Sequence, residues 1–164
     1  MTTLKDGLLQ EVAGIRLELE RLLAGMEYCL DWKPDEGEWS VREVVYHIVD
    51  TPEGGIHDAV QRTLDGALPE LTVNGNLSNM TDQRLGKDMD AVKADIEAVL
   101  SGMERALAPV DDSEMSGRET VVHSTMRGVS ETRSARNLSQ RLFAGHWREH
   151  LAQIAALRDA LGIT

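Results

Sequence analysis

The stretch that decides the fold is residues 136–161, RNLSQRLFAGHWREHLAQIAALRDAL. Apolar residues and two histidines recur in it every three or four positions, a spacing that places them on one stripe of an α-helix. This stripe consists of Leu138, Leu142, His146, His150, Ile154, Leu157 and Leu161. Gly162 then follows as a natural helix stop. The segment predicts a long helix with one buried face, on which histidines take positions that leucine usually fills.

Two other segments have the same helical period along their whole length. Residues 3–30 and residues 82–108 each carry one continuous apolar stripe with charged residues on the opposite face. Pro109 ends the second of them, because proline has no backbone N–H to donate. Both segments predict uninterrupted amphipathic helices.

A fourth helical segment begins at Ser40. Ser40 and Glu43 form the pattern of a capping box, in which each side chain accepts a hydrogen bond from the other residue's backbone N–H. The helix is expected to run to about Asp50, to be interrupted by Pro52, and to resume until Gly66.

Four long amphipathic segments in one chain of this length predict an all-α fold, a four-helix bundle in which residues 1–164 form a single domain. Residues 67–80 read as a polar loop long enough to cross from one end of the bundle to the other. Residues 109–134 have no helical period, and a small hairpin around Arg127 and Gly128 is expected there.

Composition and charge exclude several classes of protein. The chain has 164 residues, 41% hydrophobic and 27% charged, which is typical of an ordinary globular domain. The net charge of −11 argues against a nucleic-acid-binding surface and against binding to an anionic membrane. Cys29 is the one cysteine, so no internal disulfide can form. We find no signal peptide and no apolar stretch of membrane-spanning length, and we expect a cytoplasmic protein.

His146 and His150 are the candidate metal ligands of the last helix. Residues four apart lie one turn apart on the same face, so the two imidazoles can converge on one ion. A catalytic metal usually takes three protein ligands, and His47 on the helix that starts at Ser40 is the best third candidate. Neutral imidazole suits zinc, nickel or copper. The alternative is that these are core histidines whose ring nitrogens bond to carbonyls.

Two other metalloenzyme interpretations fit the sequence poorly. H-x-x-E-H, here with Glu149, also occurs in a class of zinc peptidases, but these need a further acidic ligand downstream, and only Asp159 follows. Glu149 is therefore expected to be a surface charge. A di-iron bundle needs Glu-x-x-His motifs, which do not occur here.

The remaining polar and aromatic candidates carry less information. We expect His57 to lie at the surface or in a pocket wall, and His123 to have no partner at helical spacing. Cys29 is expected to be a small apolar filler. Trp147 lies beside the histidine stripe, where it would pack on a neighbouring helix or on a second subunit, and this makes a homodimer plausible.

Two motifs together resemble the DinB/YfiT-like family. They are PDEGEWSVREVVYHI at residues 34–48 and HWREHLAQIAALRDALG at residues 146–162. The resemblance implies an up-up-down-down four-helix bundle and a divalent metal, often nickel or zinc, held by His47, His146 and His150. It also implies a homodimer.

The resemblance suggests small-molecule chemistry. Some members transfer low-molecular-weight thiols to electrophiles, and others are proposed hydrolases. An acidic residue and an arginine that many relatives carry along the second helix have only Glu53 and Arg62 as counterparts here. We therefore expect a metal-dependent thiol transferase that uses a low-molecular-weight thiol. The alternatives are a metal-dependent hydrolase, with Glu53 as general base, and a non-catalytic bundle that binds a small molecule or a protein.

Overall fold

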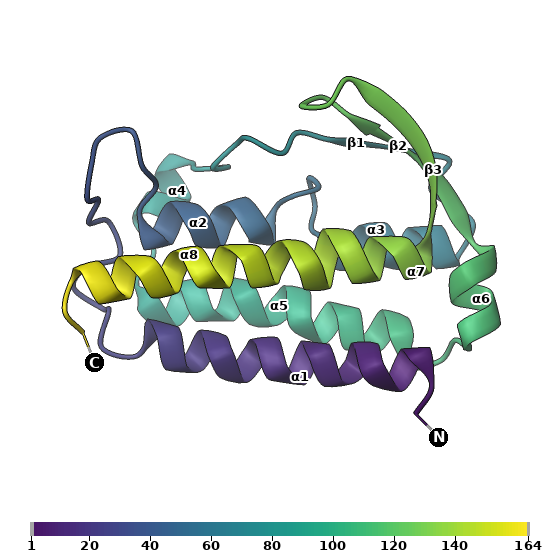
Figure 1. Cartoon of the computed structure of the whole chain (residues 1–164), viewed down its shortest axis with the longest axis horizontal. Coiled ribbons are helices and arrows are strands. Elements are labelled where there is room, and N and C mark those ends of the chain that lie inside the picture. Colours follow the sequence, from purple (N-terminus) through teal and green to yellow (C-terminus); the bar gives the residue numbers. More distant parts are fainter. Residues whose placement is uncertain (1, 164) are drawn as a thin grey trace.

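The structure is a computed structural model that describes residues 2–163. Its elements follow one another along the chain as four helical rods and one small sheet (Figure 1). Their bounds are α1 Leu4–Leu23, α2 Val41–Val49, α3 Ile56–Leu64, β1 Glu70–Val73, α4 Asp82–Leu85, α5 Met89–Leu107, α6 Asp112–Gly117, β2 Glu119–Ser124, β3 Val129–Ser134, α7 Ala135–Asn137, the π-helical segment η1 Leu138–Gly145 and α8 His146–Ala160.

The four rods are α1, α2 with α3, α5, and the continuous run of α7, η1 and α8. Lys5, at the start of α1, donates to the carbonyl of Ala108 just past the end of α5, so these two rods are antiparallel. Arg158, near the end of α8, donates to the carbonyl of Leu22 near the end of α1, so those two are parallel. In chain order the rods run up, down, down and up (Figure 1), which corrects the up-up-down-down order that the resemblance implied.

The connections explain this order. Residues 24–40 stay at one end of the bundle, where the backbone N–H of Arg42 bonds to the Leu30 carbonyl, so α2 must return antiparallel to α1. Residues 65–88 instead cross the length of the bundle, as expected for the 67–80 loop, so α5 starts at the same end as α2 (Figure 1). The core between the rods is mostly aliphatic, as the scarcity of aromatic residues predicts.

Helical periodicity overestimated the length of two helices. The first was expected to reach residue 30, but α1 ends at Leu23 because Gly25 adopts a left-handed backbone conformation (φ 79°). Met26 and Leu30 remain buried in the turns that follow, which is why the stripe appeared continuous. The segment 82–108 is interrupted between α4 and α5, where Asp88 caps the start of α5 by accepting from the Ala91 N–H.

In the fourth predicted segment, the helices begin and end close to the positions that the sequence predicted. Ser40 and Glu43 form both bonds of the capping box. The helix stops at Val49, before Pro52, and resumes as α3 until Leu64, and Gly66 follows with φ 71°.

The fold is not all-α. β1 lies within the segment expected to be an irregular polar loop, and it pairs in parallel with β2, which pairs antiparallel with β3. The β2–β3 hairpin turns at residues 125–128, which confirms the hairpin expected around Arg127 and Gly128. The segment before it, expected to lack helix, contains α6. Val73 and Val122 point their side chains into the bundle, which attaches the sheet to the helices.

The last rod contains a π-helical segment that the spacing could not show. A π turn holds about one residue more than an α turn, so it shifts the buried face of the rod by one position. The buried residues are Phe143, Trp147 and Leu151, one position after the predicted Leu142, His146 and His150. The histidines consequently lie at the edge of the core, half-buried, and not in its centre.

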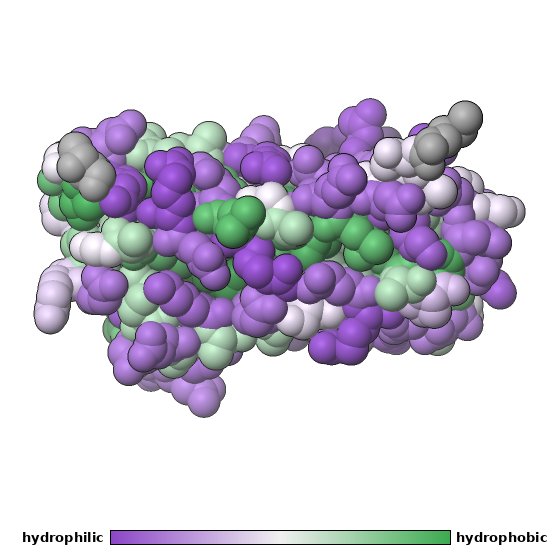
Figure 2. Space-filling view, turned by 90° about the horizontal axis from the view of Figure 1, so that it is seen from below, coloured by the Kyte–Doolittle hydropathy of each residue, from purple (hydrophilic) through white to green (hydrophobic). Residues whose placement is uncertain are grey.

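Trp147 is completely buried, so it offers no surface to a second subunit, and the argument for a homodimer from this residue was wrong. The homodimer itself stays a prediction. The outer face of α1, seen from below in Figure 2, is mostly hydrophilic, with smaller apolar areas between the charged side chains. Within residues 2–163 no helix is both long and apolar enough to cross a membrane.

Gly102, in the middle of α5, gives a stability prediction whose sign is opposite to helix propensity. A Cβ at Gly102 would lie 2.7 and 2.8 Å from Cγ and Cβ of His57, and the Cβ of His57 cannot move without moving α3. We expect Gly102→Ala to lower the free energy of unfolding by about 1–3 kcal/mol. Gly7→Ala, where a Cβ meets nothing within 4 Å, should instead raise it by roughly 0.5–1 kcal/mol.

Urea unfolding followed by circular dichroism measures both changes. A second substitution, His57→Ala, should recover part of the loss in Gly102→Ala, because it removes the ring and Cγ but leaves the Cβ that lies 2.8 Å from the new methyl group. If Gly102→Ala stabilises the protein as Gly7→Ala does, the packing of α3 on α5 is looser than described here.

Candidate metal centre

His47 from α2 and His146 and His150 from α8 bring their imidazoles together between the two helices. One ligand nitrogen from each lies within 4.8 Å of the others. Nε2 of His47 is 3.0 Å from Nε2 of His146, and the ring of His47 packs edge-on against both other rings. Within residues 2–163 this is the one cluster of three or more histidine, cysteine or acidic side chains with such spacing, and no carboxylate belongs to it.

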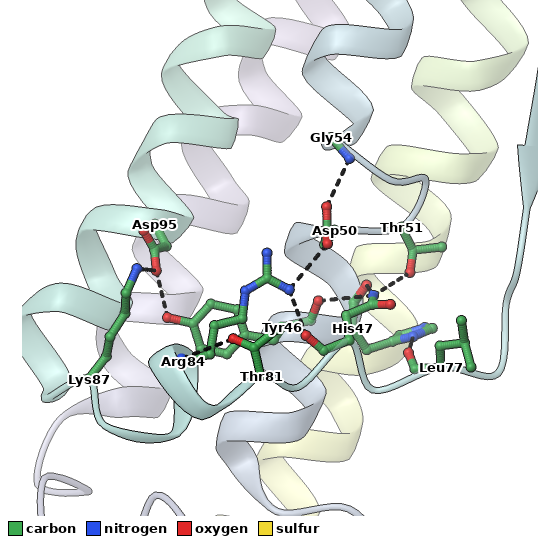
Figure 3. Close-up of polar contacts among 11 residues, drawn as sticks. Tyr46, His47, Asp50, Thr51, Gly54, Leu77, Thr81, Arg84, Lys87 and Asp95 are labelled. Atoms are coloured by element: carbon green, nitrogen blue, oxygen red, sulfur yellow. Dashed lines mark hydrogen bonds and ion pairs between the residues drawn. The ribbon is translucent and has the colours of Figure 1, made fainter.

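Hydrogen bonds fix which nitrogen of His47 faces the cluster. Its Nδ1 donates to the backbone carbonyl of Leu77 at 2.7 Å (Figure 3), because a carbonyl oxygen can only accept. The neutral ring therefore carries its proton on Nδ1, and Nε2 presents a lone pair to His146. A hydrogen bond from the far ring nitrogen to a carbonyl is the usual support of a metal-binding histidine.

His150 is oriented in the same way. Its Nδ1 lies 2.8 Å from Oε1 of Gln153, one turn further along α8, which leaves Nε2 for the cluster. Trp39, just before α2, lies over the rings of His47 and His150, with centroids 4.8 and 6.4 Å away. The indole shields this side of the cluster from water.

The surroundings of His47 and His146 favour their neutral forms. Burial lowers the pKa of His146 to about 4, and the nearby His150 and His47 add to the effect. Burial also lowers the pKa of His47, against the opposite influence of the Leu77 carbonyl. Metal ions bind the unprotonated imidazole, so these surroundings hold His47 and His146 in the form that a metal requires.

A divalent ion fits this donor set. Nitrogens bound to one ion at about 2.0–2.1 Å lie roughly 2.8–3.4 Å apart in octahedral or tetrahedral geometry, which agrees with the 3.0 Å between His47 and His146. Without an ion the pair can share one proton between the two Nε2 atoms. Nδ1 of His146, which is buried and has no hydrogen-bond partner, would then be an unsatisfied acceptor.

The end of α2 is held by the crossover that precedes α4. The side-chain amide of Asn79 donates to the carbonyls of Tyr46 and His47 at 3.2 and 3.3 Å and to Oγ1 of Thr51 at 3.1 Å. Arg84 joins the Asn79 carbonyl at 2.6 Å to the carboxylate of Asp50 at 3.1 Å (Figure 3). These bonds place the Leu77 carbonyl opposite His47.

The helix α2 is also tied to α5. The Tyr46 hydroxyl donates to Asp95 at 2.6 Å, and Lys87 donates to the same carboxylate oxygen at 2.7 Å (Figure 3). Burial and the negative charge of Asp95 raise the pKa of Tyr46, so the phenol stays protonated. The helix that carries His47 is therefore fixed from two sides.

A cleft opens beside His146. It lies between the sheet and the last rod and has a volume of about 600 Å³. His146 and Glu149 belong to its lining, and Glu149 is exposed, as expected for a surface charge. The cleft therefore gives a small molecule access to one of the three histidines.

Glu53 and Arg62 lie outside the histidine cluster. Glu53 is exposed and lines a different cleft of about 330 Å³ together with Leu77 and Asn79. Arg62 is 3.8 Å from Asp58 on the exposed side of α3. The structure thus brings together the three predicted ligands, but the Glu53 carboxylate does not belong to their group.

The other histidines and the cysteine are also elsewhere. His57 packs against Gly102, half-buried. His123, for which no partner was expected, lies within 2.6 Å of Ser130 and 3.3 Å of Glu70 across the sheet. The Sγ of Cys29 lies 3.6 Å from the Met26 carbonyl, far along the chain from the cluster.

Sequence reasoning missed the residues that support the ligands. Gln153 could have been found, because it follows His150 at the i,i+3 spacing of neighbours on a helix. The Leu77 carbonyl could not, since any residue type offers a carbonyl and only the path of the crossover places this one.

Comparisons with known proteins agree with this architecture. A family model described as the DinB superfamily matches residues 16–154. Among solved structures, the chain is similar to YfiT from Bacillus subtilis, described as a probable metal-dependent hydrolase with an unusual four-helix bundle topology. The two share 19% sequence identity with a TM-score of 0.74, over 98% of this chain and 89% of YfiT. A search of curated proteins found no significant match.

Proposed function

The chain belongs to the DinB superfamily. From this premise we propose that His47, His146 and His150 bind one divalent metal ion. We further propose that the protein is a metal-dependent hydrolase of a small molecule. The convergence of three imidazole nitrogens within 4.8 Å carries the proposal. The description of YfiT, which has a similar fold, as a probable metal-dependent hydrolase supports it. Zinc and nickel are the ions that we propose first, because imidazole suits both.

Three histidines leave room for a substrate or a water on the ion, which is the arrangement of catalytic rather than structural sites. A bound divalent ion supplies a Lewis acid and lowers the pKa of a coordinated water towards 7. The chain's own contribution is to hold His47 and His146 neutral, to fix the rings of His47 and His150 through Leu77 and Gln153, and to shield one side with Trp39. The cleft beside His146 admits the substrate.

Thiol transfer is the second candidate, and one observation favours it. No carboxylate of residues 2–163 belongs to the histidine group, so the group contains no acidic side chain that could take a proton from water. A thiol loses its proton more readily than water does, and it needs no such base. Since Cys29 does not belong to the group either, the thiol would come from a low-molecular-weight compound in the cleft.

Metal content tests the proposal first. We expect untagged protein purified without chelator to hold about one equivalent of zinc or nickel by inductively coupled plasma mass spectrometry. The double variant His146→Ala, His150→Ala should lose it, whereas His123→Ala, a histidine of the sheet, should retain it. Wild-type protein that binds no divalent ion, even after reconstitution, would contradict the proposal and favour a non-catalytic binding bundle.

The loaded protein then distinguishes the two reactions. Hydrolysis predicts turnover of activated esters or amides without added thiol, whereas thiol transfer predicts turnover of an electrophile such as monochlorobimane only when a thiol is added. Either activity should disappear in the double histidine variant.

A further inference from the structure

The cleft beside His146 is lined by apolar residues in one part and by charged residues in another. Its apolar part includes Val73 and Val122 from the sheet and Leu142 from η1. Its charged part includes Arg127 and Arg133 from the hairpin and Arg141 from η1. A ligand with an apolar body and one charged group would match both parts.

The charge of this lining is opposite to that of the protein. The chain carries a net charge of −11, yet the three arginines of this cleft face a single lining carboxylate, Glu149. The cleft beside Glu53 shows the contrast, because Asp50 and Glu53 there outnumber Arg84. A concave positive site on an acidic protein concentrates anions locally.

The three arginines differ in how far they are already paired. Arg133 and Arg127 share the carboxylate of Glu131, at 2.9 and 3.2 Å. Arg141 is exposed, and its side chain makes no hydrogen bond or ion pair with any residue of the described range 2–163. Of the three, Arg141 is the one whose guanidinium forms no ion pair within residues 2–163, so it is the one available to an anion.

We propose that this cleft binds the carboxylate of an organic acid through Arg141, assisted by Arg127 and Arg133. The apolar part of the acid lies on Val73, Val122 and Leu142, and its reacting bond is directed towards His146. A guanidinium binds a carboxylate with two parallel hydrogen bonds, which orients the acid as well as holding it. The direction of the reacting bond rests on the proposed function; the arginine site does not.

A matched pair of probes tests the charge preference. We would titrate 4-phenylbutyrate and the uncharged 4-phenylbutyramide into metal-loaded and into metal-free protein, at low salt, by ligand-observed NMR. We expect the acid to bind about tenfold more tightly than the amide in both forms of the protein. Arg141→Gln should weaken binding of the acid about fivefold and leave the amide unchanged.

Arg136→Gln is the matched control, since Arg136 is exposed on α7 in the same region but does not line the cleft. It should bind both probes as the wild type does. Equal binding of acid and amide, no binding of either, or equal losses in the Arg136 and Arg141 variants would each overturn the proposal.

Failure of the metal proposal gives a different result. If the protein holds no metal but Arg141→Gln still weakens binding of the acid, the arginine site stands and the hydrolase proposal falls. If the preference for the acid disappears on metal removal and is unaffected by Arg141→Gln, the carboxylate binds the ion and the arginine site is refuted.

Discussion

Replacing Arg42 by methionine should lower the free energy of unfolding by about 2–4 kcal/mol. Only 5% of the surface of Arg42 is exposed, although it is a charged residue on α2. Its guanidinium makes two bonds to Asp31, at 2.7 and 3.2 Å, and donates to the carbonyls of Arg84 and Lys87 at 3.0 and 2.5 Å. Methionine keeps most of the buried volume, so the change isolates the lost hydrogen bonds.

The two carbonyls dominate this cost. Arg84 lies in the last turn of α4, where its carbonyl also accepts from the Lys87 N–H at 3.2 Å, and Lys87 lies in the break before α5. Carbonyls at the end of a helix lack the partners that the helix interior provides. Asp31 contributes less, because its side chain is 55% exposed and water can replace the arginine. Arg42→Lys keeps the charge but not the fork of donors, and it should give an intermediate loss.

Arg21→Met is the control for this prediction. Arg21 is also an arginine paired with a carboxylate, at 2.6 Å from Glu18, but its side chain is 63% exposed. Its replacement should leave the unfolding midpoint in urea almost unchanged. Equal midpoints for Arg42→Met and Arg21→Met would show that the break between α4 and α5 is held by other contacts.

The histidine cluster was predictable because residue type and spacing both point to it. His146 and His150 are one turn apart, and the Ser40 capping box fixes the start of the helix that carries His47. The helical rods and the hairpin were predictable in the same way. Each of these features depends on the local pattern of residue types, which can be read from the sequence.

The features that the sequence did not predict correctly depend on the path of the chain. The order of the rods follows from which connection crosses the bundle, and a count of loop residues does not decide this. The π-helical segment is equally hidden, because Leu142 and Phe143 are adjacent apolar residues and either could begin the buried face. The one-residue shift determines that His146 borders a cleft and that Trp147 is buried.

Replacing Asn79 by glycine should weaken metal binding about 10- to 100-fold while the fold persists. The Asn79 amide holds the last turn of α2 and, two residues after Leu77, fixes the carbonyl that accepts from His47. Glycine suits this position because Asn79 has φ 61°, a left-handed conformation that glycine adopts without strain. The substitution therefore removes the side-chain bonds and leaves the backbone conformation accessible.

Asn76→Gly is the matched control, since Asn76 lies in the same crossover, is exposed, and makes no side-chain hydrogen bond within residues 2–163. Competition with a chromophoric zinc chelator gives the affinity of each variant, and far-UV circular dichroism reports the helix content. A wild-type affinity in Asn79→Gly would mean that His47 is held by α2 alone. A loss confined to Asn79→Gly would instead show that a backbone carbonyl of the crossover orients the ligand, so that the metal centre depends on a segment without a ligand of its own.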